Sequence, residues 1–300
     1  MVTAVFDRAR RVPGSRERAG DLLFRLTISG VAGIILLAAG ALAWQLARES
    51  ASTWKSFGLA FLWTSTWDPV SDVFGVLPFL YGTAVSSLLA LLIAVPLGVG
   101  AAIFLTELAP KRLADILMFA IELLAAVPSV ILGLMGIFIL VPGMRALGAP
   151  YGVGMLTAGL ILAFMVLPYI TTITREVLLT VPRPLKEAMY ALGGTRWEVV
   201  RGVSLPYARS GIVGAVFLSL GRALGETMAV TMVIGNTPKI SASLLAPGYS
   251  MAAVIANELA EAASDAHLSA LVAIGLTLMV VTIVVNGAAR LMLYRLGSRK

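Results

Sequence analysis

Long apolar stretches alternate with short polar ones along most of this 300-residue chain. A run of about 20 mostly apolar residues is long enough for a helix to cross a bilayer, and the pattern predicts six such helices. The predicted spans are residues 26–47, 79–106, 117–141, 153–173, 207–236 and 267–289. Pro128 interrupts the third of them. The pattern therefore predicts an all-α integral membrane protein with six transmembrane helices.

The composition agrees with a membrane protein. Hydrophobic residues make up 59% of the chain and charged residues only 13%, whereas a soluble domain carries roughly a quarter charged residues. The net charge of +7 does not indicate a nucleic-acid partner, because the basic residues are dispersed among short loops. The chain has no Cys and a single histidine, His267, so neither disulfides nor a thiolate or histidine-cluster metal site is expected.

The basic residues also predict how the spans are oriented. Six spans place both termini on one side, and most Lys and Arg residues lie there; the other side carries Arg48, Lys55, Arg145 and Lys239. Cytoplasmic loops are enriched in Lys and Arg, so we expect both termini in the cytoplasm. Residues 1–25 would form a cytoplasmic basic segment, and residues 26–300 a six-span domain. The first apolar run is longer than the core of a signal peptide, so we expect it to be retained.

Residues 187–206 form the longest polar interruption in the second half of the chain. Pro184, just before it, suits the first turn of a helix, and the pair Gly193-Gly194 is typical of a helix end. Thr195 and Glu198 have the spacing of a capping box. We therefore expect two short helices joined by a tight turn, with Pro206 ending the second.

Two ionisable residues lie inside the predicted fifth span. Arg222 and Glu226 are four residues apart, which would place them on one helix face. Each costs roughly 2.5–3.5 kcal/mol at the centre of a spanning helix, so such residues usually face a pathway or another helix. Because a guanidinium matches the geometry of phosphate, an oxyanion pathway is one interpretation. A packing pair is the other.

Two further carboxylates give weaker signals. Glu107 lies four residues before Lys111 near a span end, which favours an ion pair between them at the cytoplasmic interface. Glu122, in the predicted third span, could face either the pathway or the polar 187–206 segment. His267 begins the predicted sixth span and is expected to lie at the membrane interface.

The sequence contains no G-x-x-x-x-G-K-[ST] phosphate loop. We therefore expect no catalytic residues and no cofactor in this chain, with ATP and magnesium bound by a separate ATPase subunit if transport is ATP-driven. An ion-coupled secondary transporter is the alternative of a different class. Such transporters commonly contain internal repeats, and none is visible in this sequence.

Residues 187–206 resemble the EAA loop of ABC-importer permeases. The family pattern is Glu-Ala-Ala, three residues, glycine, nine residues and Ile-x-Leu-Pro. The residues that match it in register are Glu187, Ala188, Gly193, Leu205 and Pro206. Met189 and Val203 replace the third residue and the isoleucine with other apolar side chains. The resemblance implies a MetI-like type I permease core over about residues 79–290, with this loop as the cytoplasmic coupling helix that docks on the ATPase.

Four further segments are similar to the PstC family, the permease subunits of phosphate-specific ABC importers. They are residues 67–83, 121–136, 221–231 and 240–262. The resemblance implies phosphate import across the bacterial inner membrane, with Arg222 and Glu226 in the translocation pathway. It also implies a PstA-like second permease, a PstB-like ATPase dimer and a PstS-like phosphate-binding protein, periplasmic or lipid-anchored. A permease for another oxyanion, molybdate or sulfate, is the alternative.

Overall fold

The computed structural model describes residues 15–297. Most of the predicted basic segment 1–25, and the tail residues Arg299 and Lys300, lie outside the described residues. The chain divides into two units, Met1–Arg48 and Glu49–Lys300. The first unit is described from Ser15 onward and consists of α1 (Ser15–Glu49), which ends just inside the second unit. Apolar residues lie on all faces of α1, as expected of a helix surrounded by lipid.

The second unit is also helical, and its one strand-like pairing among the described residues is a bridge between Asp68 and Val73. Its helices are α2 (Ala51–Phe57), α3 (Leu77–Ile103), α4 (Lys111–Ala126), α5 (Ser129–Met135), α6 (Val141–Ala146), α7 (Met155–Leu179), α8 (Arg183–Ala191), α9 (Arg196–Val199), α10 (Leu205–Leu224), α11 (Met228–Val233), α12 (Met251–Glu258) and α13 (Asp265–Gly297). Wider π-helical turns extend α3 over Phe104–Leu108, join α5 to α6 over Gly136–Leu140, and join α9 to α10 over Val200–Ser204.

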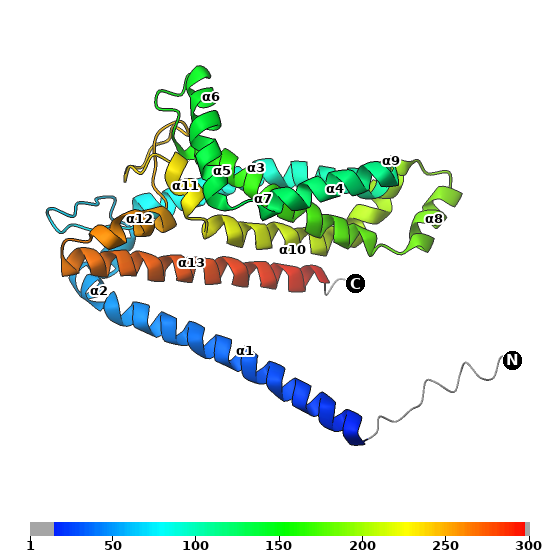
Figure 1. The fold of residues 1–300 in the computed structure, drawn as a ribbon, viewed down its shortest axis with the longest axis horizontal. Helices are drawn as coiled ribbons and strands as arrows, with labels where there is room; N and C mark the ends of the chain where they lie inside the picture. The colour runs from blue at the N-terminus through cyan, green and yellow to red at the C-terminus, as the bar shows by residue number, and fades with distance from the viewer. Residues whose placement is uncertain (1–14, 298–300) are drawn as a thin grey trace. The chain divides into compact units, whose positions relative to one another are not determined.

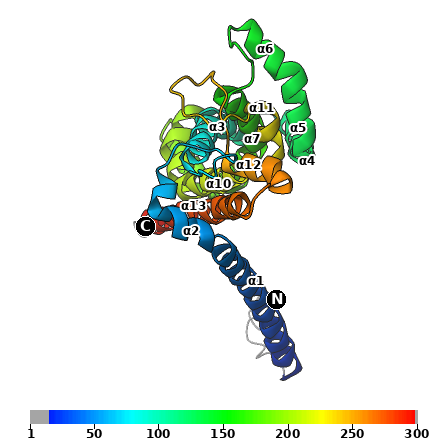
Figure 2. The same ribbon diagram turned by 90° about the vertical axis from the view of Figure 1, so that its left-hand side faces the viewer.

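Helices α3, α7 and α10 form the centre of the second unit and pack along one another (Figure 1). Small residues allow this close approach. A Cβ atom at Gly98 would lie 2.8 Å from the Ile170 side chain, and one at Gly211 would lie 2.5 Å from Val177. In the end-on view of Figure 2 these three helices cluster together, while α6 lies at the periphery of the unit.

Six described helices are long and apolar enough to cross a membrane, which confirms the predicted number. They are Asp21–Glu49, Leu77–Leu108, Ser129–Ala146, Met155–Leu179, Arg196–Leu224 and Asp265–Arg295. The third and fifth of these helices begin and end at other residues than the predicted spans 117–141 and 207–236.

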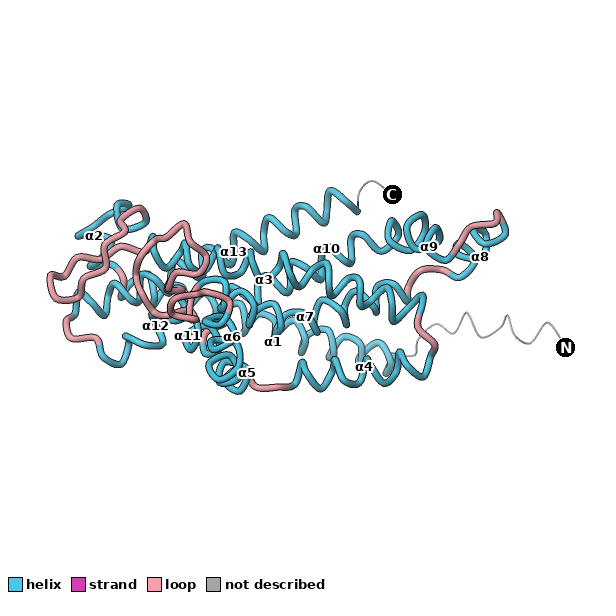
Figure 3. Tube along the Cα trace, turned by 90° about the horizontal axis from the view of Figure 1, so that it is seen from above, coloured by secondary structure: helices cyan, strands magenta, loops and turns pink. Residues whose placement is uncertain are grey.

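The interruption predicted at Pro128 is confirmed, but the bounds 117–141 are wrong, because the membrane-length helix runs from Ser129 to Ala146. Helix α4 ends at Ala126, Val127 is extended (φ −65°, ψ 127°), and α5 begins after Pro128. The residue before a proline is disfavoured in the α-helical region, which explains the break. The tube in Figure 3 shows the short link between α4 and α5. Helix α4 lies along α7, whereas α5 packs against α11.

The prediction for 207–236 is wrong at both ends. Helical structure is continuous from Arg196 to Leu224, so Pro206 does not end a helix. Pro206 lies directly after the wider π-helical turn Val200–Ser204, where the regular α-helical hydrogen-bond pattern is already interrupted. At the other end, residues 225–227 are not helical and a separate helix, α11, follows.

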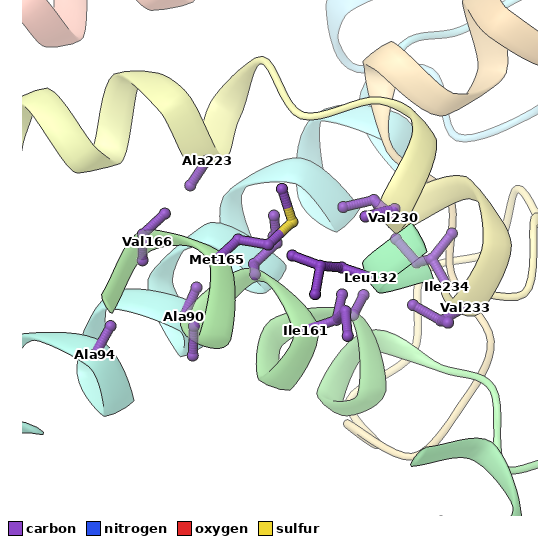
Figure 4. Close-up of a cluster of buried hydrophobic side chains, with 14 of the residues drawn as sticks. Ala90, Ala94, Leu132, Ile161, Met165, Val166, Ala223, Val230, Val233 and Ile234 are labelled. Atoms are coloured by element: carbon purple, nitrogen blue, oxygen red, sulfur yellow. The ribbon is translucent and has the colours of Figure 1, made fainter. Parts of the chain in front are cut away.

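A buried apolar cluster explains why α11 does not continue α10. Val230 and Val233 of α11 pack with Leu132 of α5 and with Ile161 and Met165 of α7 (Figure 4). Helix α11 sits so close to α5 that a Cβ at Gly133 would lie 3.0 Å from the Ala229 Cα. The cluster thus fixes α11 against α5 and α7.

A second cluster is rich in aromatic residues and surrounds the start of α13. The His267 ring is buried, stacks on Phe74 with the ring centroids 5.6 Å apart, and places its Nε2 atom 3.1 Å from Glu258 Oε2. The Trp67 Nε1–H donates to the same carboxylate oxygen at 2.9 Å. His267 therefore lies at the start of a span, as predicted, but as part of a buried core.

Candidate coupling and translocation sites

Residues 183–206, called the EAA segment below, project from one end of the bundle, at the opposite end from α11 and α12 (Figure 1). Helix α8 has Pro184 in its first turn. It ends with Gly193 at φ +86° and with the Gly194 N–H donating to the Met189 carbonyl at 3.1 Å. This positive φ favours glycine. The predicted helix end is therefore confirmed.

The predicted capping box at the start of α9 is also confirmed. The Glu198 N–H donates to Thr195 Oγ1 at 3.3 Å, and the Thr195 N–H donates to Glu198 Oε2 at 2.7 Å. The Thr195 Oγ1–H also donates to Glu198 Oε2 at 2.8 Å. The geometry between α8 and α9 is thus set by a glycine turn and a reciprocal cap.

The EAA segment presents a largely exposed surface. Of the five matched positions, Glu187, Ala188, Gly193 and Pro206 are exposed, and Leu205 is half-buried. Apolar side chains are exposed beside them, among them Leu185, Tyr190, Leu192 and Trp197. Arg183, Arg196 and Arg201 surround these residues and are exposed as well. An exposed apolar patch with a polar rim is typical of a protein-docking surface.

The EAA segment is tied to the bundle through Glu107. Lys186 Nζ lies 2.6 Å from Glu107 Oε1, and Ser204 Oγ donates to the same oxygen at 2.9 Å. The predicted ion pair between Glu107 and Lys111 is wrong. The helix ends at Leu108, Ala109 is extended, and Lys111 begins a new helix, so the two residues do not share a helix face.

Arg222 lies in the last turn of α10 and its side chain is exposed in this chain. Its guanidinium carbon lies 4.2 Å from the centre of the Tyr169 ring of α7, a distance at which the ring attracts a cation. The partial negative charge at the C-terminal end of α10 also favours a positive charge there. Arg222 is therefore held against an aromatic ring.

Glu226 does not share a helix face with Arg222, so that prediction is wrong. Its N–H donates to the Ala223 carbonyl at 3.4 Å, and its Oε1 accepts from the Ala229 N–H at 3.4 Å, in the first turn of α11. Among the residues that the structure describes, no ion pair joins it to Arg222. The break after Leu224 leaves Arg222 in the last turn of α10 and Glu226 in the link before α11. Glu122 lies exposed on α4, and its role stays a prediction.

Sequence reasoning missed three residues at these sites: Tyr169, Lys186 and Ser204. A tyrosine in the middle of an apolar span, directly after Pro168, was the available signal for the first. Lys186 and Ser204 gave no comparable signal, because their partner lies on a distant helix. Within residues 15–297, no group of three or more potential ligand side chains could hold a metal ion.

Comparison with known proteins places this arrangement in a family. Residues 94–297 match the model of the family described as "Binding-protein-dependent transport system inner membrane component". The chain is 47% identical over 299 residues to the phosphate transport system permease protein PstC of Mesorhizobium japonicum, covering 93% of this chain and 91% of that protein. It is 43% identical to the protein of the same name from Xylella fastidiosa, covering 100% of this chain and 99% of the relative.

Solved structures share the fold at low sequence identity. A bacterial ABC transporter involved in the import of the acidic polysaccharide alginate aligns with a TM-score of 0.64 at 15% identity, over 93% of this chain and 96% of the other. An inward-facing MetNI methionine ABC transporter aligns with a TM-score of 0.56 at 21% identity, over 74% and 94%. The apolar helices and the family match identify a multi-pass inner membrane protein. The chain belongs to the PstC family of binding-protein-dependent transport system inner membrane components.

Proposed function

We propose that this chain is one of two permease subunits of an ATP-driven importer that moves inorganic phosphate across the cytoplasmic membrane. The observation that carries the proposal is Arg222, an exposed guanidinium at a helix break, in a chain that is 47% identical to a phosphate transport permease. A guanidinium offers a fork of N–H donors that matches phosphate oxygens. An apolar pathway needs such a group, because removing an ion from water costs several kcal/mol.

The proposed complex contains a PstA-like second permease, a PstB-like ATPase dimer and a PstS-like phosphate-binding protein, periplasmic or lipid-anchored. ATP and magnesium would bind the ATPase chains, since this chain has no phosphate loop. The exposure of Arg222 fits a pathway that the second permease completes. Most Lys and Arg residues lie on the side of the two termini, and cytoplasmic loops are enriched in these residues. The proposed orientation therefore places both termini and the EAA segment in the cytoplasm.

We further propose that Tyr169 holds Arg222 ready for the anion. A cation over an aromatic face gains about 0.5–2 kcal/mol. The contact is with an aromatic ring and not with a hydrogen-bond acceptor, so it leaves the guanidinium N–H groups for phosphate. Glu226 accepts the Ala229 N–H at the start of α11 instead of facing Arg222, so it does not neutralise the cation while the anion approaches.

The EAA segment would couple transport to the ATPase. Its exposed apolar side chains would dock in a cleft of the ATPase, and closure of the ATPase dimer would move α8. Continuous helical structure of 29 residues runs from Arg196 to Leu224, about 43 Å long at 1.5 Å per residue. It has the EAA segment at its start and Arg222 in its last turn, so movement at one end would alter the pathway at the other.

The test of this proposal is the selectivity of uptake. Cells that depend on this permease should take up labelled phosphate, and excess unlabelled molybdate or sulfate should not compete. Competition by either anion with equal strength would point to a general oxyanion permease. Uptake that persists after deletion of the ATPase gene would instead favour an ion-coupled transporter.

The orientation predicts which residues a membrane-impermeant thiol reagent can reach. Val70 and Leu192 are 95% and 84% exposed, and the chain has no native Cys. In intact spheroplasts, Val70→Cys should be labelled and Leu192→Cys should be labelled only after the membrane is opened. The reverse pattern would contradict the proposed orientation.

Variants of Tyr169 should separate ring stacking from the hydroxyl group. Tyr169→Phe should transport phosphate at nearly the wild-type rate, because the ring remains and the hydroxyl makes only a long 3.4 Å contact to the Ala125 carbonyl. Tyr169→Leu should lower the uptake rate about threefold, since a cation–π contact contributes roughly 0.5–1 kcal/mol at exposed sites. Equal rates for the two variants, measured by initial uptake at matched protein level, would contradict this role.

A further inference from the structure

Three segments meet at the carboxylate of Glu107. The residue lies in the π-helical turn Phe104–Leu108 at the end of the α3 span. Its Oε1 atom accepts from Lys186 of α8 at 2.6 Å and from Ser204, just before α10, at 2.9 Å. The Glu107 side chain is 9% exposed and Ser204 is fully buried. One oxygen thus joins the EAA segment to two membrane-length helices.

Packing alone does not require a charge at this point. Ala102, Ile103, Leu178, Val200 and Ala208 already form a buried apolar cluster in the same region. Buried ion pairs can commonly be replaced by apolar side chains without loss of stability. A buried carboxylate that binds two donors from different segments therefore suggests a role beyond holding the fold together.

Helix α8 depends on this contact more than the other segments do. None of its residues is buried, and its main contacts are with the neighbouring α9 and the Val200–Ser204 turn. Among the hydrogen bonds of the described residues, Lys186 to Glu107 is the one side-chain bond that joins α8 to α3 or its extension. Without it, α8 would be held mainly by its connections along the chain.

We propose that Glu107 is the positioning residue that transmits movement of α8 to the membrane helices. Its carboxylate binds α8 through Lys186 and the α10 helix through Ser204, so a displacement of α8 moves α3 and α10 together. This inference rests on the proposed coupling function of the EAA segment. Loss of the link would let the ATPase move α8 without moving the pathway, and ATP would be hydrolysed without phosphate import.

The experiment measures phosphate uptake and ATP hydrolysis in the same proteoliposomes, which contain the full complex and the binding protein. Glu107→Gln keeps the size and an acceptor for Ser204 but removes the charge that binds Lys186. We expect uptake per ATP hydrolysed to fall about tenfold, as for loss of a charge-assisted hydrogen bond, while ATP hydrolysis keeps at least half of its rate. The charge exchange Glu107→Lys with Lys186→Glu should restore most of the coupling.

Glu176→Gln is the matched control. Glu176 pairs with Arg175 at 2.8 Å on the last turns of α7, and its side chain is 61% exposed, so its loss should leave coupling unchanged. Should Glu107→Gln fail to assemble, Lys186→Met tests the same link from its more exposed side, with the same expected uncoupling.

Three results would overturn the inference: unchanged coupling in Glu107→Gln and Lys186→Met, a proportional loss of uptake and hydrolysis, or failure of both variants to assemble. The last two would make the contact structural. Failure of the proposed function is distinct, because the wild-type complex itself would then show no ATP-driven phosphate uptake.

Discussion

Replacing Arg222 with glutamine is expected to lower phosphate uptake by about 100-fold, because the pathway loses the charge that offsets several kcal/mol of anion desolvation. The protein should still insert and assemble, since the Arg222 side chain is exposed in this chain and pairs with an aromatic face rather than with a carboxylate. Arg222→Lys should keep part of the transport, because the charge remains while the forked donor geometry is lost.

Uptake of labelled phosphate by cells, together with the amount of assembled complex in the membrane, measures this effect. Arg209→Gln is the control, since Arg209 is an exposed arginine near the other end of the same helix. If Arg222→Gln prevents assembly, the arginine is a packing device and the pathway assignment fails. Normal uptake in Arg222→Gln would contradict both the pathway and the packing roles.

A bulky, β-branched residue at Gly193 should abolish coupling. Gly193 has φ +86° and joins α8 to α9, and Val at such a position is strained by about 1–3 kcal/mol. The space around Gly193 is open, with nothing within 4 Å of an added Cβ, so membrane insertion should be unaffected. Gly193→Val should therefore turn α8 away from its docking position and reduce uptake at least about tenfold.

Gly193→Asn tests whether the loss of uptake comes from a changed backbone conformation or from the added side chain itself. Because Asn tolerates a left-handed conformation, this variant should keep most of the uptake. Gly202→Ala is a second control, because its added Cβ would make an ordinary 3.6 Å contact with Met189. Co-purification of the ATPase, measured alongside uptake, should fall for Gly193→Val alone. Full ATPase binding and normal uptake in that variant would show that the shape of the EAA segment does not matter.

Local sequence signals predicted the parts of this fold that depend on neighbouring residues. The capping box at Thr195 and the helix end at Gly193 follow from interactions within a few residues, and the structure has both. The number of spans also followed from apolar length. Pro128 marked an interruption in the right place, but the sequence does not tell how the next helix is directed. That direction depends on the contact of α5 with α11.

The break after Leu224 could not be predicted from the sequence, because it too depends on contacts between helices that are distant along the chain. The apolar pattern continues through residues 228–234, and only the packing of α11 on α5 and α7 fixes it as a separate helix. Arg222 and Glu226 stood out as charges in an apolar run. Their partners did not, because Tyr169 and the backbone of Ala229 meet them only in the folded chain.

The most direct test of the account is ATP-dependent accumulation of labelled phosphate in proteoliposomes that contain the complete complex and its binding protein. The wild-type complex should accumulate phosphate only when ATP is supplied to the ATPase side. The Arg222→Gln complex should hydrolyse ATP at a similar basal rate and accumulate almost none. Phosphate accumulation without ATP, or equal accumulation by the two complexes, would contradict an ATP-driven phosphate pathway that passes Arg222.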